Sequence, residues 1–109
     1  MTYKEIKTMI AGIGLPYAYY QFSEDTGQAP PFICFYYTDN DDFLADNTNY
    51  QTIVALNVEF NSDQKDFTTE ATIEAALTCA GLVFAKDETF IDSEKMHETI
   101  YTMEVVING

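Results

Sequence analysis

The sequence predicts an α+β fold: a single αβββαββ domain, residues 1–109, with a mainly antiparallel sheet and two helices packed on one face. Strand-like segments follow a helical N-terminal segment, and a second helical segment precedes a final hairpin, an order typical of α+β proteins. Residues Tyr50 to Phe60 alternate between apolar and polar side chains, and Phe67 to Ala80 carry an apolar stripe that can cover the apolar face of that strand. At 109 residues the chain has the size of one domain.

The N-terminal segment predicts a short helix. Thr2 and Glu5 form the T-x-x-E pattern of a capping box, and apolar residues follow at helical spacing until Gly12. Pro16 then favours an extended backbone, and the aromatic run YAYYQF, Tyr17 to Phe22, predicts the first strand.

The middle of the chain predicts two longer strands. Residues Phe32 to Thr38 are apolar with almost no polar break, so we expect a central strand that is covered on both faces. In the alternating strand Tyr50 to Phe60, one face should be buried and the other mostly exposed to water.

The C-terminal half predicts a helix and a hairpin. Asp66 can cap a helix over Phe67 to Ala80, and Gly81 can end it. Residues 82–91 and 97–107 then predict two strands joined by a turn at DSEK.

Charge is the unusual property of the composition. Eighteen Asp and Glu are opposed by five Lys and no Arg, which gives a formal net charge of -13. Such a surface repels phosphates and anionic lipids, so we expect no direct nucleic-acid binding and no membrane binding. The expected partners are other proteins, cations or further copies of this chain.

The stretch TDNDDFLADNTNY, Thr38 to Tyr50, is the candidate functional element. Hairpin connections usually take about 2 to 5 residues, and much longer ones are often functional. The calcium loop of an EF-hand is excluded because Phe43 and Leu44 stand where that loop needs an oxygen ligand and a Gly. Two adjacent apolar residues among acids are costly to expose, which favours a contact with another protein. We predict an interaction loop that includes Asp39, Asp41, Asp42, Phe43, Leu44 and Asp46. A looser cation site at Asp39, Asp41, Asp46 and Asn47 remains an alternative.

Catalytic and cofactor motifs are not recognisable in the sequence. His97 is the single histidine, and it has no nucleophile motif, phosphate loop or Cys partner beside it. Cys34 and Cys79 are far apart and lack zinc spacing, so both are expected to be buried apolar thiols in a reducing cytoplasm. We therefore expect no enzyme, no cofactor and no metal. Strand packing accounts for the tyrosines that could otherwise stack on a sugar or a base, namely Tyr17, Tyr19, Tyr20, Tyr36 and Tyr37.

Residues 30–77 and 81–107, with the pattern F-x-A-D-N-x-x-Y that begins at Phe43 and ends at Tyr50, resemble small tail proteins of long-tailed bacteriophages. These are similar to the tail-completion or tail-terminator proteins, which close the tail tube and join it to the head. The resemblance implies a non-enzymatic subunit that assembles as a hexameric ring and contacts tail-tube and connector proteins. It implies a place in the tail or neck of the virion, and in the host cytoplasm during assembly.

Two other functions remain open from the sequence. The first is an acidic DNA mimic that inhibits a basic DNA-processing protein, because surface carboxylates can imitate phosphates. The second is an enzyme that uses the acidic loop and His97. For a ring-forming protein, the charge of -13 predicts a mainly monomeric state in dilute, low-salt solution, with assembly promoted by salt, divalent cations or a tail-end template.

Overall fold

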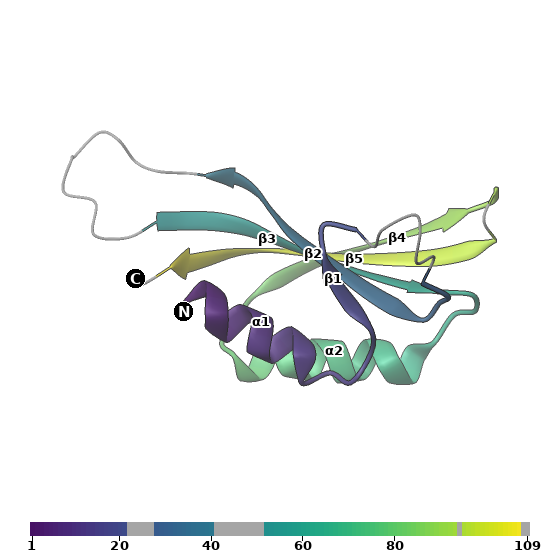
Figure 1. The fold of residues 1–109 in the computed structure, drawn as a ribbon, viewed down its shortest axis with the longest axis horizontal. Coiled ribbons are helices and arrows are strands. Elements are labelled where there is room, and N and C mark those ends of the chain that lie inside the picture. Colours follow the sequence, from purple (N-terminus) through teal and green to yellow (C-terminus); the bar gives the residue numbers. More distant parts are fainter. Residues whose placement is uncertain (22–27, 41–51, 94, 108–109) are drawn as a thin grey trace.

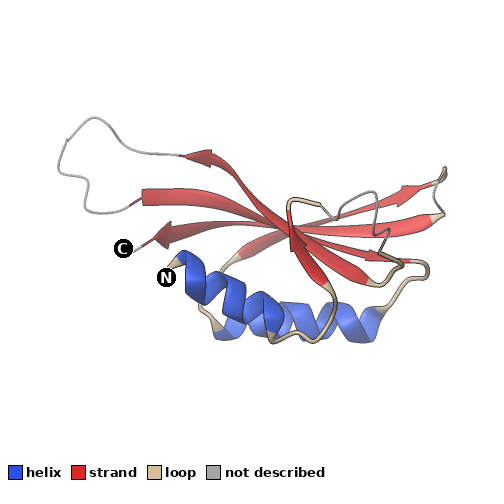
Figure 2. Ribbon diagram, in the orientation of Figure 1, coloured by secondary structure: helices blue, strands red, loops and turns tan. Residues whose placement is uncertain are grey.

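The computed structural model describes residues 1–21, 28–40, 52–93 and 95–107 (Figure 1). The elements follow in the predicted order, and the α+β class is confirmed (Figure 2). They are α1 (Tyr3–Ala11), β1 (Tyr17–Tyr19), β2 (Phe32–Asn40), β3 (Thr52–Ser62), α2 (Phe67–Cys79), β4 (Phe84–Ile91) and β5 (Met96–Ile107).

The five strands form one sheet in the order β1-β2-β3-β5-β4. Only the short β1–β2 pair is parallel, and the other three pairs are antiparallel. Both helices lie on the same face of this sheet, as predicted, and no helix of the described chain covers the opposite face (Figures 1 and 2). We refer to that opposite face of the sheet as the open face.

Both helices begin where their capping residues predict. The Glu5 amide donates to Thr2 Oγ1 (3.1 Å), and the Thr2 amide donates back to Glu5 Oε1 (2.8 Å), which completes the capping box. At α2 the Thr69 amide donates to Asp66 Oδ1 (3.0 Å). Gly81, with a φ of +79°, provides the left-handed residue that ends α2.

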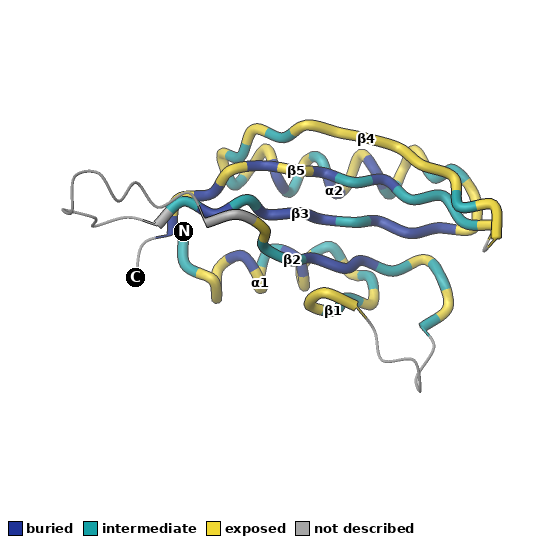
Figure 3. Tube along the Cα trace, turned by 90° about the horizontal axis from the view of Figure 1, so that it is seen from above, coloured by how far each residue is buried: buried dark blue, intermediate teal, exposed yellow. Residues whose placement is uncertain are grey.

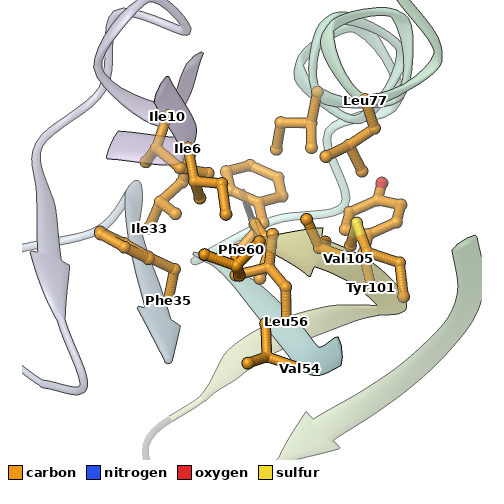
Figure 4. Packing of buried hydrophobic residues seen from close by; sticks show 14 residues of the cluster. Ile6, Ile10, Ile33, Phe35, Val54, Leu56, Phe60, Leu77, Tyr101 and Val105 are labelled. Carbon is orange, nitrogen blue, oxygen red and sulfur yellow. The ribbon is translucent and has the colours of Figure 1, made fainter. Parts of the chain in front are cut away.

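The hydrophobic core lies between the helices and the sheet (Figure 4). Alternate residues of β3 and β5 point into it, which confirms the alternation predicted for β3. The helices contribute Ile6 and Ile10 from α1 and Ile73 and Leu77 from α2, all fully buried. The strand residues are Ile33, Phe35, Val54, Leu56, Val58, Phe60, Tyr101, Met103, Val105 and Ile107.

Three details of the predicted strands are wrong. Strand β2 lies inside the sheet, between β1 and β3, but it is not covered on both faces, because Thr38 is exposed on the open face. Strand β2 continues to Asn40 rather than ending at Thr38, because it pairs with β3 as far as Val54. Strand β1 ends at Tyr19, since Tyr20 takes a left-handed backbone conformation with a φ of +74°.

The open face is less exposed along β3 than the alternation predicts. Asn57 is buried there because its side chain joins a row of polar groups across three strands. Its Nδ2 donates to Thr38 Oγ1 (3.0 Å), and its Oδ1 accepts from the Thr102 hydroxyl (3.2 Å). The polar residues of this strand are therefore paired rather than simply solvated.

Candidate interaction site

The structure bears on only one residue of the predicted interaction loop. Asp39 lies near the end of β2, so its backbone belongs to the sheet and not to a loop. The remaining loop residues, Asp41, Asp42, Phe43, Leu44 and Asp46, lie outside the described residues. The loop therefore stays a prediction.

The described residues contain a different candidate, an aromatic groove where α1 meets the β1 edge of the sheet. Its volume is about 540 Å³. The Tyr3 and Tyr37 rings meet edge to face at 5.0 Å between centroids, and the Tyr19 ring lies 5.7 Å from that of Tyr37. Tyr3 and Tyr19 are about half exposed, at 46% and 54%. The lining side chains are Tyr3, Lys7, Tyr17, Ala18, Tyr19, Phe35 and Tyr37.

Tyr37 of the groove is neutral near pH 7. Burial, together with the neighbouring Tyr19 and Tyr3, raises the pKa of Tyr37 to about 12. Its hydroxyl therefore remains a hydrogen-bond donor beside the apolar rings. Half-exposed tyrosines combine a large contact area with a polar group, a combination that is common in protein–protein interfaces.

The groove lies beside exposed positive charge. Lys4 and Lys7 are exposed on α1, and Lys7 lines the groove itself. The one carboxylate of α1, Glu5, is already used to cap the helix. This edge is thus locally basic in a strongly acidic chain.

At the opposite edge of the sheet, two lysines form ion pairs within the fold. Lys65 and Lys86 hold α2 against β4 and β5. Glu70 is buried on the sheet-facing side of α2, at 2% exposure. Its carboxylate lies 2.9 Å from Lys65 Nζ and 2.8 Å from Lys86 Nζ. Lys86 also binds Glu74 (2.8 Å), which accepts a second hydrogen bond from the Tyr101 hydroxyl (2.9 Å).

The pKa values of this network follow from its contacts. The hydrogen bond from Lys86 lowers the pKa of Glu74, and the carboxylates of Glu70 and Glu74 raise the pKa of Lys86. Burial, followed by the hydrogen bond to Glu74, raises the pKa of Tyr101. Glu74 and Lys86 therefore keep their charges near neutral pH, and Tyr101 stays protonated, so their contacts stabilise the fold rather than exchange protons.

Strand β4 forms the second edge of the sheet and is exposed along almost its whole length (Figure 3). Large apolar side chains are exposed around it: Phe67 at the start of α2 (74%), Val83 just before β4 (88%) and Phe90 within it (48%). We refer to these three residues together with Phe84–Ile91 as the β4 edge. An exposed strand of this length offers unpaired backbone groups to another chain.

The open face carries a second, polar groove of about 460 Å³ near Tyr36. The Tyr36 hydroxyl donates to Glu59 Oε2 at 2.6 Å. That hydrogen bond, with burial, raises the pKa of Tyr36 to about 12. Glu98 also lines the groove, so both of its charged lining residues are acidic.

The residues expected to be without a metal or catalytic role lie as follows in the described parts of the chain. No group of three or more His, Cys, Asp or Glu side chains in these parts of the chain could hold a metal ion. The His97 ring packs against Phe90, with centroids 4.9 Å apart. Cys34 is buried as expected, but Cys79 is exposed, so that prediction is wrong for the second thiol. Cys79 follows Leu77 by two residues, which places it on the opposite side of α2.

Sequence reasoning missed both the aromatic groove and the buried Glu70. Tyr3 and Lys7 are four residues apart and share a helix face, a spacing that could have drawn attention to α1. Their partners Tyr19 and Tyr37 come from strands, and only the fold brings them together.

No protein-family model matches the chain, and no characterised protein matches it in sequence. The resemblance to phage tail-completion proteins therefore remains a prediction. Within the described residues, neither helix has the length and apolar character needed to span a bilayer.

Proposed function

We propose that this chain is a non-enzymatic structural protein that associates with copies of itself. In this proposal it closes the tail tube of a long-tailed bacteriophage as a ring and joins the tail to the head connector. The ring is expected to be a hexamer, formed from subunits that are monomeric in dilute solution.

One observation carries the proposal: in the described parts of the chain the sheet is open at two opposite edges, and both present exposed apolar side chains. The β1 side offers the aromatic groove, and the β4 side offers an exposed strand with Phe90 and Val83. Natural monomers usually protect such edges, so two accessible ones favour assembly. The α+β fold agrees with the subunit that the resemblance implies.

Electron microscopy of virions assembled without this protein tests the role. The expected result is tails of unregulated length, or tails that are not attached to heads. Virions of normal appearance contradict the proposal. Adding the purified protein to tails made in its absence should restore joining to heads.

The acidic open face supports a second candidate, the DNA mimic that inhibits a basic DNA-processing protein. By strand alternation this face carries Glu59, Asp87, Glu98 and Glu104, and its described strand positions include no lysine. A DNA mimic competes with DNA for a basic enzyme, whereas a tail protein binds tail tube or connector. Competition with DNA for binding to a basic DNA-processing protein therefore separates the two candidates.

A further inference from the structure

The exposed apolar side chains of this protein are concentrated at two opposite edges. Among the described residues, seven large hydrophobic side chains are exposed, and of these only Val106 belongs to neither edge. Three lie at the β1 side, Tyr3, Tyr19 and Tyr20, and three at the β4 side, Phe67, Val83 and Phe90. In Figure 3, β4 runs along one side of the sheet, and β1 and α1 lie at the other.

Backbone hydrogen-bonding groups are available at the same two edges. Strand β4 is the last strand on its side. On the other side, β1 pairs only with Ile33 to Phe35, and the Tyr20 amide ends that contact by donating to the Phe35 carbonyl (2.8 Å). Beyond this point, β2 residues 36–40 have β3 on one side and no described strand on the other. Each edge can therefore accept one more strand.

The two edges differ in charge. Residues 1–21 contain Lys4 and Lys7 against Glu5 alone. Residues 65–91 contain two lysines, Lys65 and Lys86, which bind carboxylates of α2 and β4, against five carboxylates, Asp66, Glu70, Glu74, Asp87 and Glu88. Asp87 lies in the exposed stretch of β4. Opposite charges on two edges of the same molecule favour a contact between unlike edges and oppose a contact between like edges.

Strand direction agrees with this pairing. Three successive antiparallel pairings separate β2 from β4, so the two strands run in opposite directions. When a second copy keeps the same orientation, its β4 runs antiparallel to the free part of β2. Phe84 lies level with Tyr37 across the sheet and Ala85 with Tyr36, so the overlap with residues 36–40 becomes longer only when copies are displaced along the strand direction. A closed sheet with tilted strands has such a stagger.

We infer that the β4 edge of one copy docks against the aromatic groove and the free part of β2 of a second copy, in a head-to-tail contact. This inference rests on the proposed function, because it supplies the contact from which a ring is built. The α1 edge, with Lys4 and Lys7, faces the β4 edge, with Phe90 or Val83 against the exposed tyrosines and Asp87 on the open-face side of the contact. A contact between unlike surfaces repeats around an axis and can close into a ring, which a contact between like surfaces does not do.

Charge reversal on each edge tests the contact. Lys7→Glu alters the α1 edge and Asp87→Lys alters the β4 edge, both at exposed positions. Association is measured by sedimentation at a salt and magnesium concentration where the unaltered protein associates. Each variant alone should associate at least about tenfold more weakly. An equimolar mixture should recover association, because each variant retains the edge that the other has lost.

A matched control removes the effect of net charge. Asp87→Lys and Asp63→Lys change the charge of the chain equally, but Asp63 is exposed in the loop that follows β3, the middle strand of the sheet. General electrostatics predicts tighter association for both variants, since the chain becomes less acidic. The head-to-tail contact predicts weaker association for Asp87→Lys only. Circular dichroism establishes that each variant is folded before it is compared.

Three results overturn the inference. They are single variants that associate as strongly as the unaltered protein, folded variants whose mixture does not recover, and an unaltered protein that stays monomeric at every salt and protein concentration. The virion experiment is independent of these results. If virions without the protein have defective tails but Asp87→Lys associates normally, this contact is rejected and the proposed function is retained. If those virions are normal, the proposed function itself is rejected.

Discussion

Glu70 should be the most sensitive charged position of the fold, because its carboxylate is buried and depends on two lysines. Its side chain is 3% exposed, against 25% for Lys65 and 34% for Lys86. Removing both lysines by Lys65→Met and Lys86→Met leaves a buried carboxylate without a cation. Breaking a buried ion pair in this way costs about 3–5 kcal/mol. That is a large part of the roughly 5–15 kcal/mol that stabilises a typical domain.

Variants at Lys65, Lys86 and Glu70 can be combined to separate two costs. One is the cost of burying an unpaired charge, and the other is the cost of losing an ion-pair contact. Lys86→Met alone should cost about 1–2 kcal/mol, since Lys65 still neutralises Glu70. Adding Glu70→Leu to the double variant should restore stability to within about 1 kcal/mol of the unaltered protein, because no unpaired charge remains buried. Removing Glu70 is thus expected to stabilise the protein once its partners are gone.

Urea unfolding followed by far-ultraviolet circular dichroism measures these changes. With a slope of about 2 kcal/mol per molar urea, the double variant should unfold at about 2 M less urea. Lys4→Met with Lys7→Met is the matched control, because it removes the same charge from exposed positions and should change stability by no more than about 0.5 kcal/mol. If the two double variants are equally stable, the ion network does not stabilise this fold and the reasoning is wrong.

Three further predictions follow from the tyrosines, the loop and the charge. The raised pKa values of Tyr36, Tyr37 and Tyr101 mean that folding favours their neutral forms, so this contribution to stability is present below about pH 10 and is lost as the pH rises toward 12. In a titration followed by absorbance, three of the eight tyrosines should ionise at a higher pH than an ordinary tyrosine, and Tyr37→Phe should remove one of these three. Ionisation of all eight tyrosines at the same pH in the folded protein contradicts this prediction. Phe43→Ala should weaken assembly and leave monomer stability nearly unchanged, as measured by sedimentation and urea unfolding, and a large loss of monomer stability means that Phe43 belongs to the core. Salt and magnesium should strengthen self-association in a sedimentation series, and a ring that is stable at low salt and insensitive to both shows that apolar contacts dominate.

The features that the sequence predicted correctly are those decided by neighbouring residues. The capping box at Thr2 and Glu5 depends on residues three apart, and the alternation of β3 depends on residues two apart. The element order follows from these local signals, which is why the α+β class is confirmed.

The features that sequence reasoning missed depend on distant partners. Nothing local marks Glu70 as buried, because its two cations come from the loop before α2 and from β4. The end of β1 was missed because a left-handed backbone is uncommon for tyrosine. The aromatic groove forms because core packing places α1 beside β2. The spacing of residues within either segment does not predict this contact.

The distribution of lysines links the fold of this protein to its proposed assembly. Of only five lysines, Lys65 and Lys86 stabilise α2 on the sheet, while Lys4 and Lys7 remain exposed beside the aromatic groove. Subunits of charge -13 repel one another, but at physiological ionic strength this repulsion is screened beyond about 8 Å, whereas charges in direct contact are screened much less. The apolar side chains and strand edges therefore have to supply most of the association energy. The fifth lysine, Lys95, is exposed in the turn between β4 and β5. Lys4 and Lys7 then determine the direction of the contact, because they lie on the helix that borders the aromatic groove, where a second acidic chain meets positive charge directly beside exposed apolar rings.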